Sequence, residues 1–193
     1  MRTGIFGGSF DPPHKGHIKI ALAAKEELGL ERIFIVPTGQ APHKPDISAD
    51  TSDRVNMCRQ LCEKYELNLS LYEAEKEGNC YTADLVEYFS AFYPEDELYL
   101  IVGGDSLDYM DKWYHPERIF PKCRVVVARR NGTSDEKADF LREKFGAKIT
   151  FLNCGYFEVS STEVRKAVLG GQDIWQFLEP ETADYIKKNN LYR

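Results

Sequence analysis

Short apolar runs alternate with helical patterns along most of the chain. The runs end at glycine, proline or charged residues, as buried strands do, and cover residues 3–6, 32–36, 67–71, 98–102, 123–128 and 148–152. Apolar positions at three- and four-residue spacing predict helices over 16–28, 51–64, 82–92, 134–145, 160–169 and 181–190. This alternation predicts an α/β fold with a doubly wound parallel sheet. No repeat or linker interrupts it, so we expect one domain over residues 1–193.

Glycine or polar turns follow three of the predicted strands, at Gly7, Gly103 and Arg129. The carboxyl ends of parallel strands share one edge of the sheet, and open α/β sheets bind ligands there, where the strand order reverses. We therefore expect the three turns to meet around a ligand site.

Residues 4–18 read GIFGGSFDPPHKGHI and predict a strand, a turn with paired glycines, and the start of a helix. Glycines let the main chain approach a phosphate closely, and the N–H groups of a helix start attract anions. His14 and His17 are three residues apart, which puts both rings on one face of the first helical turn. The stretch predicts a nucleotide phosphate site in which both histidines contact the polyphosphate.

Composition narrows the class of protein. The 193 residues are 42% hydrophobic and 29% charged with a net charge of −6, which fits a globular chain and argues against a general nucleic-acid binder. The five cysteines have no framework spacing. Cys58 and Cys62 lie four apart without a second ligand pair, so free thiols in a reducing compartment are the favoured interpretation. The chain starts directly in a strand and has no long apolar stretch, so we expect a cytoplasmic protein without a membrane partner.

Two motifs, residues 7–17 and 160–165, make the chain resemble the nucleotidyltransferase superfamily with its His-x-Gly-His and Ser-Ser-Thr-x-x-Arg signatures. Within it, the chain most resembles the bacterial nicotinate-nucleotide adenylyltransferases. The supporting motifs, in collinear order, are Pro42-His43-Lys44, Tyr81-Thr82, Val102-Gly103-Gly104-Asp105, Lys112-Trp113-Tyr114, Tyr185-Ile186 and Leu191-Tyr192. The chain departs from the family at Gly104, where alanine is frequent, and at Asn131, where proline usually follows the arginine.

The resemblance implies a Rossmann-like nucleotidyltransferase fold and a step of NAD biosynthesis. ATP and nicotinate mononucleotide would bind side by side, and the phosphate of the mononucleotide would attack the α-phosphorus of ATP. Deamido-NAD and pyrophosphate would result, without a covalent enzyme intermediate or a protein general base. Mg²⁺ would arrive with ATP, since it binds substrate phosphates and keeps waters, and we expect no dedicated metal site in the protein.

The resemblance also implies roles for single residues. His17, His14 and Arg165 would be catalytic, with His17 stabilising charge on the α-phosphate. The ATP and phosphate-binding residues would be Gly7, Gly8, Ser9, Phe10, Gly103, Asp105, Ser161 and Thr162. The mononucleotide would contact Lys44, Thr82, Trp113 and Arg130.

Structural roles compete with several of these assignments. Trp113 could be a core residue, Asp105 a helix cap and Lys44 a solvated loop lysine. Asp11 precedes two prolines, which makes a role in structuring the turn more plausible than a catalytic one. Ser160 and Glu163 have the spacing of a capping box, so Ser160 is expected to be the cap of its helix.

Alternative functions stay open at this point. One is another small-molecule nucleotidyltransferase of the superfamily, acting on nicotinamide mononucleotide or phosphopantetheine. The Pro-His-Lys loop, Tyr81-Thr82 and Trp113 argue against an enzyme that makes a different nucleotide product. A non-catalytic nucleotide sensor would be expected to lose His17 or Arg165, and both are present. The preference for nicotinate over nicotinamide rests on the resemblance alone. A homo-oligomer is possible, and which of Arg129 and Arg130 faces the site is open.

Overall fold

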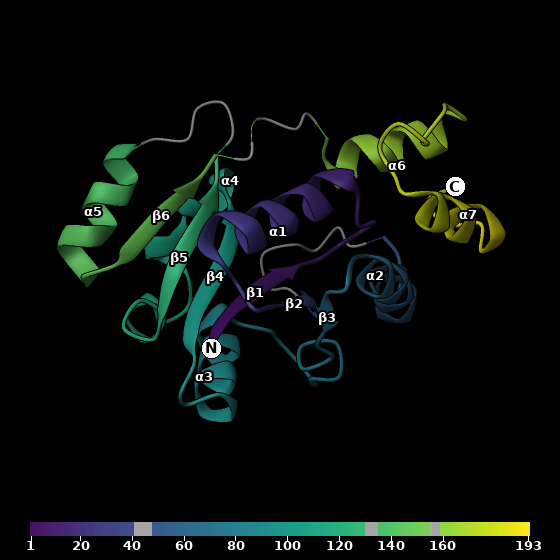
Figure 1. Ribbon diagram of the computed structural model, residues 1–193. Helices are drawn as coiled ribbons and strands as arrows, with labels where there is room; N and C mark the ends of the chain where they lie inside the picture. The colour runs from purple at the N-terminus through teal and green to yellow at the C-terminus, as the bar shows by residue number, and fades with distance from the viewer. Residues whose placement is uncertain (41–47, 130–134, 154, 156–158) are drawn as a thin grey trace.

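The structure is a computed structural model, and it describes residues 1–40, 48–129, 135–153, 155 and 159–193. Its centre is a six-stranded sheet in the order β3-β2-β1-β4-β5-β6, with every pair of neighbours parallel (Figure 1). The strands are β1 (Arg2–Gly8), β2 (Arg32–Pro37), β3 (Asn68–Leu69), β4 (Glu97–Gly103), β5 (Cys123–Ala128) and β6 (Lys148–Leu152). The order reverses between β1 and β4. The predicted doubly wound parallel sheet is confirmed.

Helices cover both faces of the sheet. The main ones are α1 (Lys15–Leu28), α2 (Thr51–Tyr65), α3 (Thr82–Phe92), α5 (Asp135–Phe145), α6 (Ser161–Leu169) and α7 (Pro180–Lys188). After β4 come a short α4 (Gly104–Leu107) and two 3₁₀ turns, η1 (Met110–Lys112) and η2 (Pro116–Arg118).

The buried side chains form three clusters that match this layering. On one face, Ala21 of α1 and Cys58 of α2 pack with Ile35 of β2. On the other face, residues of α3 and α5 pack with β1, β4 and β5. The third cluster joins α6 and α7 to Met57 of α2, so the C-terminal helices lie beside α2 at one side of the molecule (Figure 1).

The apolar pattern predicts most of the elements closely, and β5 and β6 have the predicted bounds. Two expectations were wrong. Gly7 and Gly8 form no turn but continue β1, paired in register with Val36 and Pro37 of β2. Strand β3 has two residues instead of the predicted five.

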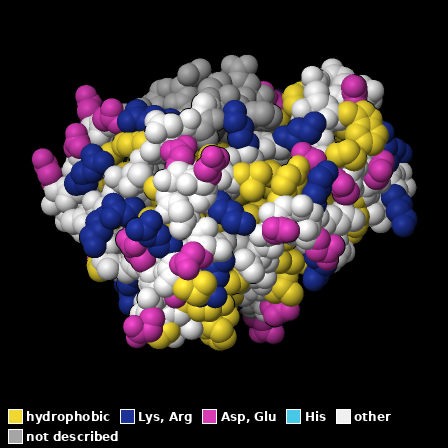
Figure 2. Space-filling view, viewed as in Figure 1, with side chains coloured by type: hydrophobic (Ala, Val, Ile, Leu, Met, Phe, Trp, Pro, Cys, Tyr) yellow, Lys and Arg dark blue, Asp and Glu magenta, His cyan; other side chains and the backbone are white. Residues whose placement is uncertain are grey.

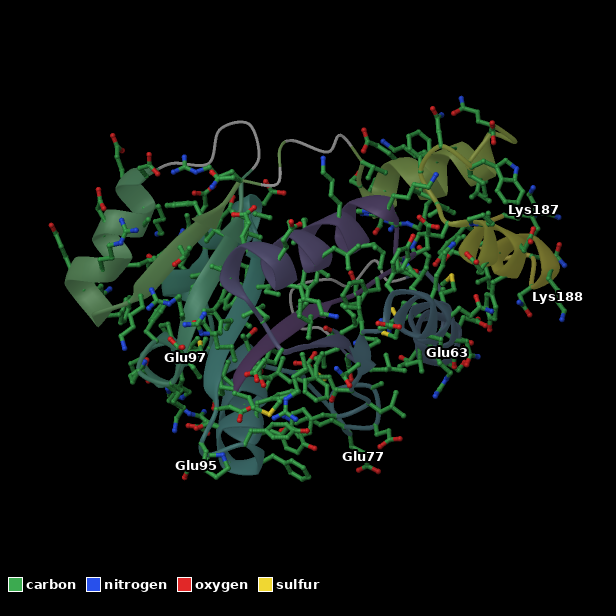
Figure 3. The ribbon with its side chains drawn as sticks, viewed as in Figure 1. Glu63, Glu77, Glu95, Glu97, Lys187 and Lys188 are labelled. Carbon is green, nitrogen blue, oxygen red and sulfur yellow. The ribbon has the colours of Figure 1, made fainter. Side chains whose placement is uncertain are left out.

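The surface is mixed in charge. On the face in Figure 2, Lys and Arg side chains are interspersed with Asp and Glu side chains rather than gathered by sign. Charged residues such as Glu63, Glu95 and Lys188 lie at the periphery and point outward (Figure 3). Among the described residues, the search for a helix with the length and apolar content to cross a bilayer finds none.

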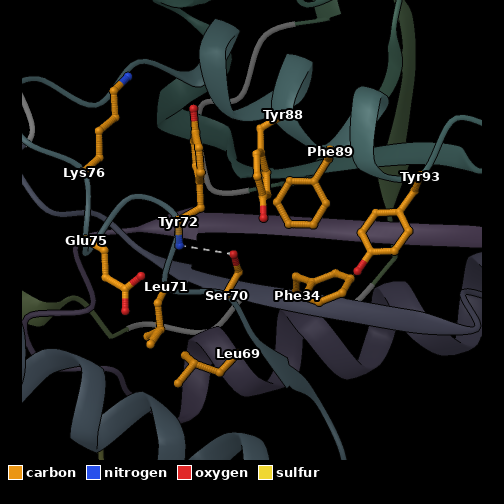
Figure 4. A pocket seen from close by; sticks show the side chains of 10 residues that line it. All are labelled: Phe34, Leu69, Ser70, Leu71, Tyr72, Glu75, Lys76, Tyr88, Phe89 and Tyr93. Carbon is orange, nitrogen blue, oxygen red and sulfur yellow. Dashed lines mark hydrogen bonds between the residues drawn. The ribbon is translucent and has the colours of Figure 1, made fainter.

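A pocket of about 530 Å³ lies on the α3 side of the sheet (Figure 4). Aromatic rings of β2 and α3 line much of it, with Tyr72 stacked on Tyr88 at a centroid distance of 4.0 Å. Its lining residues come from β2, α3 with its C-cap residue Tyr93, and the segment from β3 to Lys76. The β1–α1 loop contributes nothing, so this pocket is separate from the site predicted at the strand ends.

Candidate active site

Three strand ends meet at the carboxyl edge of the sheet, as predicted. Strand β1 pairs with β4, which pairs with β5, and Gly103 lies opposite Ala128, the residue before Arg129. A Cβ added to Gly103 would have no neighbour within 4 Å among the described residues, so the backbone there faces open space. A nucleotide could approach the main chain closely at this position.

The loop between β1 and α1 has a constrained backbone. Phe10 has a φ of 47°, in the left-handed region that bulky residues rarely adopt, yet its ring is only 2% exposed. The ring packs edge-on against Phe6 and His17, at centroid distances of 5.7 and 5.0 Å. A Cβ on Gly8 would lie 3.2 Å from that ring, so Gly8 makes room for Phe10. The Phe10 side chain therefore supports His17, and only its main chain is left to contact a phosphate.

His14 and His17 begin α1 and lie against one another. His14 is the N-cap residue, and its N–H donates to Nδ1 of His17 over 3.1 Å. The rings stack with centroids 3.6 Å apart. Because Nδ1 of His17 accepts this bond, the neutral ring carries its proton on Nε2, which makes Nε2 a donor. A donor at the start of a helix is suited to a phosphate oxygen.

Gly16, the glycine of His-x-Gly-His, is required by packing. A Cβ there would lie 3.0 Å from both Nδ1 of His14 and Cγ1 of Val159, a residue just before α6. The absence of a side chain at Gly16 thus lets the two halves of the predicted site come together.

Helix α6 is fixed to the β1–α1 loop by its own signature residues. Ser160 is the N-cap and forms the predicted capping box with Glu163. The Ser161 hydroxyl donates to the carbonyl of Pro12 over 2.9 Å, and Nη1 of Arg165 donates to the carbonyl of Asp11 over 2.8 Å. Ser161, predicted to bind phosphate, thus uses its hydroxyl on the loop.

Arg165 also lies near the Asp11 carboxylate, with Nη1 3.7 Å from Oδ2. Its Nη2 donates to the hydroxyl of Thr162, an exposed residue of the first turn of α6, over 3.4 Å. Asp11 is 2% exposed and accepts hydrogen bonds from the N–H groups of Ser48 and Ala49 at 2.7 and 3.0 Å. The expectation that Asp11 structures the turn is confirmed.

Two of the residues predicted to bind the mononucleotide, Thr82 and Trp113, come from segments that lie together. Thr82 is the first residue of α3, and Trp113 follows η1, half-buried against the core. Their neighbours Tyr81 and Tyr114 stack with centroids 4.2 Å apart. Asp105, in the first turn of α4, is exposed.

The comparisons with known proteins agree with this geometry. The family model described as cytidylyltransferase-like matches residues 5–167. The probable nicotinate-nucleotide adenylyltransferase of Clostridium tetani is 37% identical over 100% of this chain and 99% of its own length. That of Chlorobaculum parvum is 38% identical, with 100% of both chains covered. The chain belongs to the nicotinate-nucleotide adenylyltransferase family.

Solved structures support the fold. Two structures of Plasmodium falciparum nicotinic acid mononucleotide adenylyltransferase, complexed with APC and with NaAD, superpose with TM-scores of 0.80. They are 22% and 23% identical and cover 99% of this chain, with 96% and 97% of their own chains covered. At this identity the likeness shows that this chain shares their fold.

Arg54 is a site residue that the sequence interpretation missed. It is 1% exposed, and Nη1 donates to the carbonyl of Ser9 over 2.6 Å. Its Nε donates to the carbonyl of Ala49 at 3.3 Å, and Nη2 to the carbonyl of Gly39 and the hydroxyl of Thr51 at 3.4 and 3.0 Å. Burial lowers the pKa of this arginine, while the nearby Asp11 opposes that shift. Arg54 therefore ties the β1–α1 loop to the chain between the end of β2 and the start of α2.

Asp84 was also missed. It lies in the first turn of α3 and accepts from Nζ of Lys76 over 2.8 Å and from Nη2 of Arg118 over 3.1 Å. The hydrogen bond from Lys76 and the charge of Arg118 hold the pKa of the Asp84 carboxyl below its ordinary value. Arg118 also pairs with Glu87 of α3. The Asp84 carboxylate therefore holds the segments that carry Lys76 and Arg118 against the start of α3.

Two mononucleotide-binding predictions, Lys44 and Arg130, lie outside the described residues. The neighbouring Arg129 pairs with Asp135 over 2.6 Å and lies over the ring of Phe151 at 3.9 Å. Its guanidinium is therefore engaged beside α5 and β6.

The described cysteines are free and buried: Cys58, Cys62, Cys80 and Cys123. Burial raises the pKa of the Cys62 and Cys123 thiols to about 12. A search of the described residues for three or more His, Cys, Asp or Glu side chains placed to hold a metal ion finds none. Binding of Mg²⁺ with ATP stays a prediction.

Proposed function

We propose that this chain transfers the adenylyl group of ATP to nicotinate mononucleotide, producing deamido-NAD and pyrophosphate in NAD biosynthesis. One observation carries the proposal: the start of the His-x-Gly-His helix lies against α6 at the switch point of the sheet. The Ser161–Pro12 and Arg165–Asp11 hydrogen bonds hold the two together. Full-length relatives named probable nicotinate-nucleotide adenylyltransferases support it. So does the structural neighbour whose title reports a complex with NaAD.

In the reaction, an oxygen of the mononucleotide phosphate attacks the α-phosphorus of ATP. The bond from that phosphorus to the oxygen bridging to the β-phosphate breaks, and pyrophosphate leaves with the electron pair. The attacking phosphate is already ionised at neutral pH, so no protein base has to remove a proton. The protein must hold two anions in line and stabilise the charge that develops between them.

His17 donates from Nε2 to an α-phosphate oxygen as that charge develops, and His14 binds beside it. Arg165 offers two parallel N–H donors to the triphosphate. The main chain of Gly7, Gly8 and Ser9 approaches the phosphates. One pre-aimed donor of this kind typically contributes a factor of about 10²–10³ in rate. Mg²⁺ carried on the triphosphate would offset part of its charge.

The mononucleotide lies towards α3. Its pyridine carboxylate faces the N-terminus of α3 at Thr82, where the helix dipole and main-chain N–H groups favour negative charge. The Trp113 ring stacks on the pyridine. Asp105 accepts from a sugar hydroxyl, and Lys44 and Arg130 neutralise the mononucleotide phosphate.

We also propose a cytoplasmic location and a single catalytic domain, with two nucleotides as the partners and neither nucleic acid nor a membrane among them. The buried, reduced thiols fit a reducing compartment. Size-exclusion chromatography with light scattering tests whether the chain forms a homo-oligomer.

A pyrophosphate-release assay tests the activity. The purified chain is incubated with ATP, Mg²⁺ and one acceptor at a time: nicotinate mononucleotide, nicotinamide mononucleotide or phosphopantetheine. We expect the highest kcat/KM with nicotinate mononucleotide. A clear preference for phosphopantetheine, or no turnover with either pyridine mononucleotide, would overturn the assignment.

A further inference from the structure

The buried carboxylate of Asp11 collects donors from three separate parts of the chain. Oδ2 accepts from the N–H of Ser48, and Oδ1 accepts from the N–H of Ala49. Oδ1 also accepts from the hydroxyl of Tyr192 over 2.8 Å, a bond between residues 181 positions apart. The guanidinium of Arg165 lies 3.7 Å from Oδ2, which is longer than a direct hydrogen bond.

The position of Tyr192 is fixed by its backbone conformation and by the packing of its ring. Asn190 and Tyr192 both have a positive φ, of 53° and 63°, so the backbone turns sharply after α7. The ring packs on the cluster formed by α6, α7 and Met57. Burial and the neighbouring carboxylate raise the pKa of the Tyr192 phenol. The hydroxyl therefore stays protonated and donates a hydrogen bond to Asp11.

We propose that Tyr192 is a positioning residue for Arg165, acting through Asp11; this rests on the proposed function. A buried carboxylate that lacks donors attracts a nearby cation more strongly, because little else stabilises its charge. The three neutral donors satisfy Asp11, and Arg165 keeps its longer separation from Oδ2. The N–H groups of its guanidinium that do not donate to the Asp11 carbonyl or the Thr162 hydroxyl are then available for the triphosphate of ATP. Without the Tyr192 hydroxyl, Arg165 pairs closely with Asp11 and competes less well for ATP.

The test is the dissociation constant for ATP with Mg²⁺, measured by titration calorimetry on the full chain. Tyr192→Phe removes the hydroxyl and keeps the ring. We expect it to weaken ATP binding about tenfold, the scale of one hydrogen bond to a charged group, with the melting temperature little changed. The KM for nicotinate mononucleotide should stay within about twofold of the wild-type value, a split that general loss of structure would not produce.

Tyr185→Phe is the matched control. The Tyr185 hydroxyl, in the same C-terminal region, also donates to a carboxylate, that of Asp53, over 2.8 Å. The hydrogen-bond partners of this hydroxyl, Asp53 and Asn56, lie on α2 rather than in the β1–α1 loop. We expect this variant to bind ATP as the wild type does.

The decisive measurement is a double-mutant cycle with Arg165→Ala. If Tyr192 acts through Arg165, adding Tyr192→Phe to Arg165→Ala changes the dissociation constant no further. The same loss in both backgrounds, or no loss in the wild-type background, would overturn the inference. Failure of the wild type to bind ATP would overturn it together with the proposed function. ATP binding without adenylyl transfer would overturn the proposed function alone.

Discussion

The most informative single substitution is Arg54→Met. Methionine keeps an unbranched apolar stem on α2 but removes the guanidinium that donates to Ser9, Ala49, Gly39 and Thr51. Three of those four acceptors are main-chain carbonyls of the segments around the phosphate loop. Methionine cannot donate to any of them.

The structure sets the size of the effect. Two of the four bonds are 3.0 Å or shorter, those to Ser9 and Thr51, and they carry most of the loss. A hydrogen bond from a charged donor contributes about 1.5–3 kcal/mol, and removing one partner of a buried charged network costs about 3–5 kcal/mol in total. Typical domains have about 5–15 kcal/mol of stability, so we expect the variant to fold. Each kcal/mol lowers the melting temperature of a chain this size by about 2–4 °C, so the midpoint should fall by roughly 6–20 °C.

Thermal unfolding followed by circular dichroism measures the loss of stability. Calorimetric titration with ATP measures the second expected effect, a weaker affinity for ATP at the phosphate loop. Arg59→Met is the matched control, because Arg59 is an exposed arginine of the same helix and loses the same charge. We expect it to change the unfolding free energy by less than about 0.5 kcal/mol. A melting temperature of Arg54→Met within about 2 °C of the wild type would refute the structural role. Normal ATP affinity in a destabilised variant would refute the link to the phosphate loop.

Three further predictions follow from the site and its surroundings. His17→Ala should lower kcat by about 10²–10³ while the fold survives, because one donor to the α-phosphate is lost; normal turnover in the folded variant would refute its role. Asp84→Asn weakens the contacts with Lys76 and Arg118 at the start of α3. The KM for nicotinate mononucleotide should therefore rise by about threefold to tenfold, while the KM for ATP stays constant. A rise in the KM for ATP alone would contradict the placement of the mononucleotide near α3. Burial raises the pKa of Glu73, so the folded chain keeps that proton at a higher pH than the unfolded chain, and the resulting stability is lost as pH rises through the folded pKa. Glu73→Gln should therefore unfold at a higher denaturant concentration than the wild type at pH 8 and not at pH 4, and a uniform shift at both pH values would contradict the assignment.

The fold could be predicted from the sequence because its strands are buried on both faces. Val125, Val126 and Val127 are all fully buried, and a continuous apolar run of this length has few other interpretations. The two histidines and the motif at Ser160–Arg165 were predicted as one site, and the hydrogen bonds from α6 to the β1–α1 loop bear out that they lie together.

What the sequence did not reveal follows from tertiary contacts. Gly7 and Gly8 look like a turn, but pairing with β2 extends the strand through them. Gly8 is glycine because the Phe10 ring occupies the space of its side chain, and that depends on the rare backbone conformation at Phe10. A signal for Arg54 was present, since it lies four and seven residues before Cys58 and Leu61 on the apolar face of α2. A charged residue at such a position is buried only with partners, and those partners come from distant segments.

The central claim is that the mononucleotide phosphate attacks the α-phosphorus of ATP at the site formed by His14, His17 and Arg165. The most direct test uses ATP labelled with ³²P at the α-phosphate, together with nicotinate mononucleotide and Mg²⁺. We expect all transferred label to appear in deamido-NAD, pyrophosphate to be unlabelled, and His17→Ala to slow this transfer by about 10²–10³. Label in pyrophosphate, or label transfer at the wild-type rate by a folded His17→Ala variant, would contradict it.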